Sequence, residues 1–179
     1  MMSEIIEAIK HDNIPALMSL LQNGADLNAP LVLGLEYELD DPDEISPLFF
    51  AIRNYASIEL IEVLLAHGVD IFEVDSHGVS ALDVAIKFKR RDVVSLCLDK
   101  GFELNATKRR SGITPLMLAA CFNDIAIIDL LLSSGADINQ RDAQGMSAKD
   151  YAKRLGQKKV VEFLDSKGGR FFLYQEEQE

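Results

Sequence analysis

A pattern of about 34 residues recurs along this chain and constrains its fold more than any other feature. Hydroxyl residues recur at intervals of 34, 34 and 33 residues, at Ser46, Ser80, Thr114 and Ser147. An alanine follows five positions after each, at Ala51, Ala85, Ala119 and Ala152, and Ser3 and Ala8 keep the same offset. A glycine closes each unit, at Gly24, Gly68, Gly101, Gly135 and Gly168. A fixed period of this length predicts a stack of similar supersecondary units, here five.

Each unit has the sequence signals of two helices. The Ser or Thr is typical of a helix N-cap, and Pro47 and Pro115 stand at the first helical position, where no N–H is needed. The recurring alanine allows two helices to approach closely. The second helix has apolar residues at helical spacing, as in Ile127, Ile128 and Leu131, and its closing glycine predicts a left-handed C-cap. The fold class is therefore all-α.

These residues resemble the ankyrin repeat, whose pattern runs D-x-x-G-x-T-P-L-H-x-A-A and then I-V-x-L-L-L-x-x-G-A-D-V-N. The likeness is close in Asp142 to Gly145, Thr114 to Ala120 and Ile127 to Asn139, and it extends over residues 3–166. The resemblance implies a solenoid of helix-turn-helix units with β-hairpin-like finger loops. The family's histidine is replaced by Phe49, Asp83, Met117 and Asp150, and we expect the two aspartates to form capping boxes with Ser80 and Ser147.

The predicted organisation is one ankyrin-repeat domain over residues 1–166 and a tail over 167–179. The units fall at about 1–28, 29–72, 73–105, 106–139 and 140–166. A terminal repeat must present a polar outer face, and Lys149, Lys153 and Asp165 replace apolar residues in the last unit. The tail segment from Phe171 to Tyr174 is too apolar for a free end, so folding back over the last repeat is favoured. Insertion into a partner or a second copy is the alternative.

Charge is distributed unevenly along the chain, whose formal net charge is −11. Residues 1–86 contain 16 acidic and 2 basic residues, whereas residues 87–179 contain 13 acidic and 16 basic ones. The acidic half would repel phosphates, so we expect no nucleic-acid partner, and a basic protein fits that half better. Cys97 and Cys121 are too far apart for a metal or redox motif. With no leader or membrane-span pattern, the expected state is a cytoplasmic monomer without membrane attachment.

An acidic insertion over about residues 29–45 enlarges the finger between the first two units. It contains Glu36, Tyr37, Glu38, Asp40, Asp41, Asp43 and Glu44. Three interpretations remain open: a solvated insertion, a docking surface for a basic partner, and a calcium site. The last lacks the D-x-[DN]-x-[DN]-G ligand spacing of an EF-hand.

The resemblance also implies where a partner would bind, namely at the finger tips and at the two positions after the paired alanines. The finger tips are Ser76, His77 and Val79, then Arg110, Ser111 and Ile113, then Ala143, Gln144 and Met146. The other positions are Arg53, Asn54, Lys87, Phe88, Cys121 and Phe122, with Tyr55 one position later. Stacking would place Phe88 and Phe122 about 10 Å apart, either as binding anchors or packed beneath their own fingers.

A basic group accompanies them in the third and fourth units, at Lys87, Lys89, Arg90, Arg91, Lys108, Arg109 and Arg110. It is either ordinary solvated surface or, opposite the acidic insertion, a second pole that orients a partner.

No motif for catalysis, metal binding or phosphate binding is present. His11, His67 and His77 are dispersed and do not pair at the spacing of metal ligands, and the glycines are explained by caps and turns. The predicted function is a non-enzymatic protein-binding module without cofactors that uses its finger loops and concave face. An inhibitor or immunity-type protein for a basic partner is one variant. The alternative is a scaffold or accessory subunit docked through the C-terminal aromatic tail.

Overall fold

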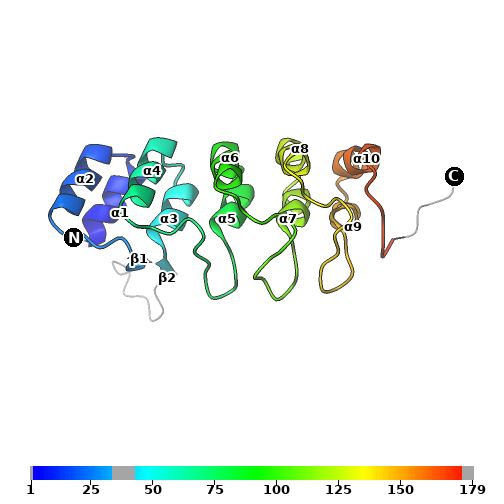
Figure 1. Cartoon of the computed structure of the whole chain (residues 1–179), viewed down its shortest axis with the longest axis horizontal. Helices are drawn as coiled ribbons and strands as arrows, with labels where there is room; N and C mark the ends of the chain where they lie inside the picture. Colours follow the sequence, from blue (N-terminus) through cyan, green and yellow to red (C-terminus); the bar gives the residue numbers. More distant parts are fainter. Residues whose placement is uncertain (1, 34–42, 175–179) are drawn as a thin grey trace. The chain divides into compact units, whose positions relative to one another are not determined.

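The computed structural model describes residues 2–33 and 43–174, which form two compact units, Met1–Glu73 and Val74–Glu179. The first unit contains helices α1 (Met2–Lys10), α2 (Ile14–Gln22), α3 (Pro47–Arg53) and α4 (Ile58–Ala66), and strands β1 (Leu31–Leu33) and β2 (Asp43–Ile45). The second contains α5 (Ala81–Lys87), α6 (Arg91–Asp99), α7 (Pro115–Cys121), α8 (Ile125–Ser133), α9 (Ala148–Arg154) and α10 (Lys158–Ser166). Each unit is therefore built from helix pairs, as an ankyrin solenoid is (Figure 1).

In the second to fifth repeats the first helix forms for the reasons that the sequence indicates. In the first repeat α1 begins at Met2 and contains Ser3, so Ser3 is not its N-cap. Ser46, Ser80, Thr114 and Ser147 are N-caps whose side-chain oxygens accept the N–H three residues on. The predicted capping boxes are confirmed: Asp83 accepts the amide of Ser80 at 2.9 Å, and Asp150 accepts that of Ser147 at 2.9 Å. In the fourth repeat the Met117 sulfur accepts the amide of Thr114 at 3.5 Å instead.

Within each unit the core lies between the helices of neighbouring repeats. The recurring alanines Ala51, Ala85, Ala119 and Ala152 have no exposed surface, and Leu48, Leu82 and Leu116 are buried beside them. Within the second unit, α5 packs against α7 and α7 against α9. Each second helix is followed by a glycine with positive φ, for example 99° at Gly135, which confirms the predicted left-handed caps.

The acidic insertion begins and ends in a short antiparallel ladder that pairs Leu31 with Ile45, Val32 with Glu44 and Leu33 with Asp43. The tip of the insertion lies outside the described residues. In the parts of the chain that are described, no helix is long and apolar enough to cross a membrane.

The start of the C-terminal tail folds over the last repeat, as predicted. Asn105 donates to the carbonyl of Gly135 at 3.1 Å and accepts the amide of Asp137 at 2.7 Å, which joins two successive repeats. Asn139 makes the same pair of bonds to Gly168, at 3.3 Å, and to Arg170, at 2.8 Å. The tail thus enters along the path that a following repeat would take.

The expectation that Lys149 belongs to a polar outer face is wrong. The tail covers it, so its side chain is 2% exposed, with its ammonium 2.5 Å from Asp165 and 4.2 Å from the ring centroid of Phe171. An aromatic face is a favourable neighbour for a buried ammonium. Lys153 and Asp165 are exposed, as expected.

Candidate functional site: finger loops and helix turns of the second unit

The three finger loops of the second unit, residues 74–80, 107–114 and 141–147, project to the same side of their helices, the lower side in Figure 1. Two of them are held by the same carboxylate turn. Asp75 accepts the amides of His77 at 2.8 Å and Val79 at 2.9 Å. Asp142 accepts those of Gln144 at 2.9 Å and Met146 at 2.8 Å. These fingers therefore have a defined backbone and do not depend on a partner for their shape.

Neighbouring fingers touch through their backbones. At Gly78, whose φ is 75°, an added Cβ would lie 2.5 Å from the carbonyl oxygen of Lys108. In the next pair, Ser111 accepts the amide of Ala143 at 2.9 Å. Close contact requires glycine at the first of these positions, and it places successive finger tips side by side.

The predicted finger residues differ in accessibility. Ser76, His77 and Arg110 are exposed, and Val79 and Ile113 are half-buried. Met146 is not a tip residue, because it is buried at 3% exposure and its sulfur lies 3.7 Å from Arg154.

Of the three consecutive basic residues Lys108, Arg109 and Arg110 in the fourth repeat, two face solvent and one contacts the preceding repeat. Lys108 and Arg110 are exposed, whereas Arg109 turns back to Asp83 at 3.3 Å. Arg109 therefore connects two repeats and is less available to a partner.

The turns between the first and second helices of each repeat hold the remaining predicted residues. We call residues 87–92, 121–125 and 153–159 together the turn end of the second unit. Phe88 and Phe122 are the C-caps of α5 and α7, with nearly the same φ and ψ, and both are half-buried. Exposed Lys87 places its ammonium 5.9 Å from the ring centroid of Phe88.

Leu155 is a member of this column that the sequence reasoning missed. It is the C-cap of α9 with the same backbone conformation, and it is 52% exposed. The signal was its place 33 residues after Phe122, the same interval that separates Thr114 from Ser147. The turn end thus presents three apolar side chains from three successive repeats.

Ion pairs fix the turn end. Arg91 reaches 3.1 Å to the buried carboxylate of Asp124 in the next repeat, and Arg90 lies 2.6 Å from Asp92. The Arg90 hydrogen bond lowers the pKa of Asp92 below its usual value, so this carboxylate is charged at neutral pH. Gln157 donates to the carbonyl of Cys121 at 2.9 Å, which ties the fifth repeat to the fourth.

A pocket of about 370 Å³ opens at the junction of α9 and α10, where Gly156, the residue after Leu155, is part of its lining. It is lined by Lys153, Gly156, Gln157, Lys158, Val161 and Glu162. Lys153 and Lys158 are exposed and Val161 is half-buried, so the lining combines two lysine side chains with one apolar side chain.

The other predicted residues belong to the first unit. Arg53 is exposed, and Tyr55 is 65% exposed with a φ of 57° in the turn after α3. Of the insertion residues, Glu36, Tyr37, Glu38, Asp40 and Asp41 lie outside the described residues, and Asp43 begins β2. Residues 2–33 and 43–174 contain no group of three or more His, Cys, Asp or Glu placed to hold a metal ion.

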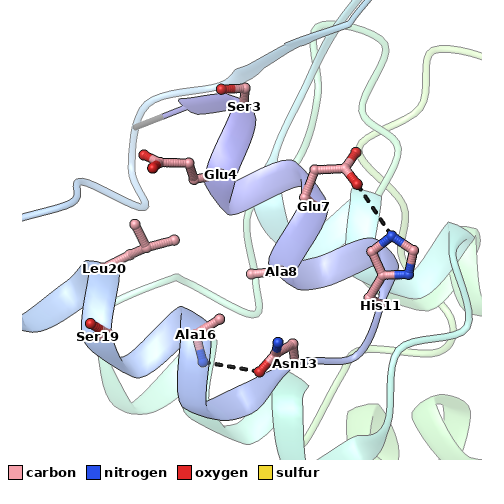
Figure 2. A pocket seen from close by; sticks show the side chains of 9 residues that line it. All are labelled: Ser3, Glu4, Glu7, Ala8, His11, Asn13, Ala16, Ser19 and Leu20. Carbon is pink, nitrogen blue, oxygen red and sulfur yellow. Dashed lines mark hydrogen bonds and ion pairs between the residues drawn. The ribbon is translucent and has the colours of Figure 1, made fainter.

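The first unit also has an open groove of about 510 Å³ between α1 and α2 (Figure 2). Ala8, Ala16 and Leu20 line it together with Glu4 and polar side chains. Glu7 on its rim lies 3.2 Å from the His11 ring. The sequence reasoning did not predict this groove.

Comparisons with known proteins agree with this architecture. A family model described as ankyrin repeats in three copies matches residues 5–108, and a model of the single ankyrin repeat matches residues 111–143. The chain is 31% identical over 170 residues to ankyrin repeat protein FPV031 of fowlpox virus, covering 92% of this chain and 47% of that protein. It is 39% identical over 135 residues to FPV219 of the same virus, covering 74% of this chain and 27% of that protein.

A protein named L-asparaginase, from Dirofilaria immitis, is 27% identical over 157 residues, or 88% of this chain and 25% of that protein. The chain thus spans less than half the length of these relatives. Since the three-copy model alone matches more than half of its residues, the chain belongs to the ankyrin repeat family.

Proposed function

We propose that this chain is a non-enzymatic protein-binding module whose second unit contacts a partner through its finger tips and turn end. The observation that carries the proposal is the apolar column of Phe88, Phe122 and Leu155, which stands on a scaffold of fixed backbone turns. Aromatic and aliphatic side chains held in this way contribute most to protein interfaces. The expected state is a monomer in the cytoplasm, without cofactors.

The partner of the acidic half is proposed to carry a basic surface. Residues 1–73 contain 14 acidic and two basic residues, so their charge would speed the approach of a basic protein and repel an acidic one. An inhibitor or immunity-type role fits this charge. At about 0.5 M salt, where the Debye length falls to about 4 Å, binding of such a partner is expected to weaken strongly. Unchanged affinity would exclude the electrostatic role.

The experiment is affinity capture from a lysate of the native source, followed by mass spectrometry. A variant with Phe88→Ala and Phe122→Ala is compared with Phe102→Ala and Phe163→Ala, two half-buried phenylalanines outside the fingers and turns of the same unit. A third variant neutralises the acidic residues of 36–44. A partner retained by the wild type and the control but lost from the first variant supports the proposal. Equal capture by all of them contradicts it.

The alternative function, a scaffold docked through its tail, has an observation of its own. Phe172, Leu173 and Tyr174 are 40%, 57% and 36% exposed although their amides bond to Asp150. Truncation after Lys167 would remove both the docking side chains and the cover of the last repeat. Leu173→Ala with Tyr174→Ala separates the two, since it removes exposed apolar surface and keeps the amides. Loss of assembly in this double variant would favour the scaffold.

A further inference from the structure

We infer that the turn end of the second unit binds an acidic segment of a protein partner, one that also carries apolar side chains. This inference rests on the proposed function and assigns a chemistry to the partner at this surface. The acidic segment inferred here is distinct from the basic surface that we propose for the partner of the acidic half. One partner that carries both features, or two different partners, would satisfy both proposals.

Charge is the first argument. The turn end contains eight basic and two acidic residues, a net charge of +6 in a chain whose total is −11. Its two carboxylates, Asp92 and Asp124, are already paired with Arg90 and Arg91. The basic residues of the turn end still outnumber its carboxylates, so its net charge is opposite in sign to that of the whole chain.

Helix stability does not account for the position of these charges. Lys158 and Lys159 occupy the first turn of α10, where the helix dipole disfavours basic residues. The N-caps of α6 and α10, Arg90 and Gln157, make no side-chain capping bond. At α6 the Asp92 carboxylate accepts backbone amides of the first turn and offsets the helix start. The first turn of α10 has no acidic residue, so this helix start adds a partial positive charge to the surface. A residue choice that opposes local stability, as at Lys158 and Lys159, is typical of a functional site.

The apolar column supplies the second half of the recognition. Phe88, Phe122 and Leu155 come from three successive repeats, and α5, α7 and α9 pack in that order. Neighbouring packed helices are about 10 Å apart, so a helical or extended segment can contact two or three of them at once. Lys87 and Lys89 flank the first member, and Lys153 and Arg154 precede the last.

The pocket beside Leu155 gives the segment an end point. Lys153 and Lys158 both line it, together with Gly156 and Val161, so a carboxylate that enters the pocket meets two lysine side chains. An apolar neighbour in the same segment can then contact Leu155, which precedes Gly156 in the chain. Glu162 also lines the pocket, and its negative charge opposes the entry of a second carboxylate. The arrangement fits acidic and apolar residues in alternation better than an unbroken acidic run.

A protein segment fits this surface better than the other anionic classes. A long polyanion such as nucleic acid would meet six excess positive charges at the turn end. The rest of the chain is strongly negative and would repel it, which opposes extended contact. An anionic membrane would need a broad basic face, whereas these charges border a narrow apolar column.

The test uses a fluorescein-labelled twelve-residue peptide that alternates pairs of Glu and Leu, with a Lys and Leu peptide of the same pattern as its control. Fluorescence anisotropy with the full chain is expected to show binding of the Glu peptide alone. Lys153→Gln with Lys158→Gln is expected to weaken binding by about tenfold. Lys100→Gln with Lys167→Gln changes the net charge equally in the same unit, away from the fingers and the turn end, and is expected to change the affinity less than about twofold.

Leu155→Ala, whose side chain is half exposed and so not needed for folding, is expected to weaken binding several-fold. The inference is overturned if the Glu peptide does not bind, if the control pair weakens it as much as the pocket pair, or if oligothymidylate or phosphatidylserine vesicles bind more tightly than the peptide. If a native partner is captured through the fingers and ignores the pocket pair, this inference fails and the proposed function stands. If the Glu peptide binds at this surface but no protein partner is captured, the assigned chemistry of the turn end stands and the proposed function fails.

Discussion

Asp150 is the residue whose removal most sharply tests how the last repeat is closed. It has no exposed surface, and its carboxylate accepts the amide and the hydroxyl of Ser147, both at 2.9 Å. It also accepts the amides of Phe172 at 3.1 Å, Leu173 at 3.2 Å and Tyr174 at 3.4 Å. One side chain thus caps α9 and holds the tail.

The size of the effect follows from which donors lose their acceptor in Asp150→Ala. Asn139 still holds Arg170, so the Ser147 hydroxyl keeps the Arg170 carbonyl at 2.9 Å, and the amides of residues 172–174 reach water once that segment detaches. The fully buried amide of Ser147 has no such replacement and costs about 1–3 kcal/mol, to which the lost tail contacts add about 1–2 kcal/mol. We expect a total of about 3 kcal/mol, or a Tm lower by about 6–12 °C.

Urea unfolding followed by circular dichroism measures the free energy, and hydrogen exchange of residues 168–174 reports on the tail. In Asp150→Asn the side-chain oxygen still accepts the amide of Ser147, but the side-chain NH2 group now faces the tail amides, which are donors too. This variant should therefore release the tail and lose about half as much free energy of unfolding as Asp150→Ala. Asp83→Ala breaks the corresponding box with Ser80 and should leave tail exchange unchanged. A loss below about 1 kcal/mol in Asp150→Ala, or unaltered exchange of the tail, would refute this reasoning.

Three further perturbations test other parts of the account by the same unfolding assay. Lys149→Leu should leave the free energy of unfolding within about 1 kcal/mol of wild type or raise it, whereas Lys149→Ala should lower it by about 2 kcal/mol; equal losses would contradict the buried pair with its apolar surroundings. Gly78→Ala should cost about 2–4 kcal/mol because its Cβ meets the Lys108 backbone, against about 1 kcal/mol for Gly68→Ala, where nothing lies within 4 Å; similar costs would rule out the finger contact. Burial, aided by the charge of Asp83, raises the pKa of Cys97 from 9.0 to about 12, so the thiol deprotonates first in the unfolded chain. Between pH 9 and about 12, the free energy of unfolding of the wild type should fall by up to about 1.4 kcal/mol per pH unit relative to that of Cys97→Val. Parallel plots of the two free energies against pH would exclude the raised pKa.

Local patterns predicted the repeat well because each signal acts over a few residues. A serine cap, an aspartate three positions on and a glycine after the second helix act within one helix pair, and the structure has all of them at Ser80, Asp83 and Gly101. The same reasoning identified the column of Phe88 and Phe122.

The errors arose where long-range contacts decide the environment. Lys149 reads as a surface residue until Phe171, 22 positions later, covers it. Met146 reads as a finger tip, but it is 3% exposed and its sulfur lies 3.7 Å from Arg154 at the end of α9. Leu155 was overlooked because the last repeat was read as a polar cap, although its turn has the backbone of the two before it.

The most direct test of partner binding at the turn end is photo-cross-linking in a lysate of the native source. A photoreactive residue replaces Leu155 in one variant and exposed Ser95, on α6 of the same unit, in the other. The account predicts a cross-linked protein from position 155 and none from position 95, and mapping of the adduct should find an acidic and apolar segment. Cross-links of equal yield at both positions, or none at position 155 while a partner is still captured, would contradict it.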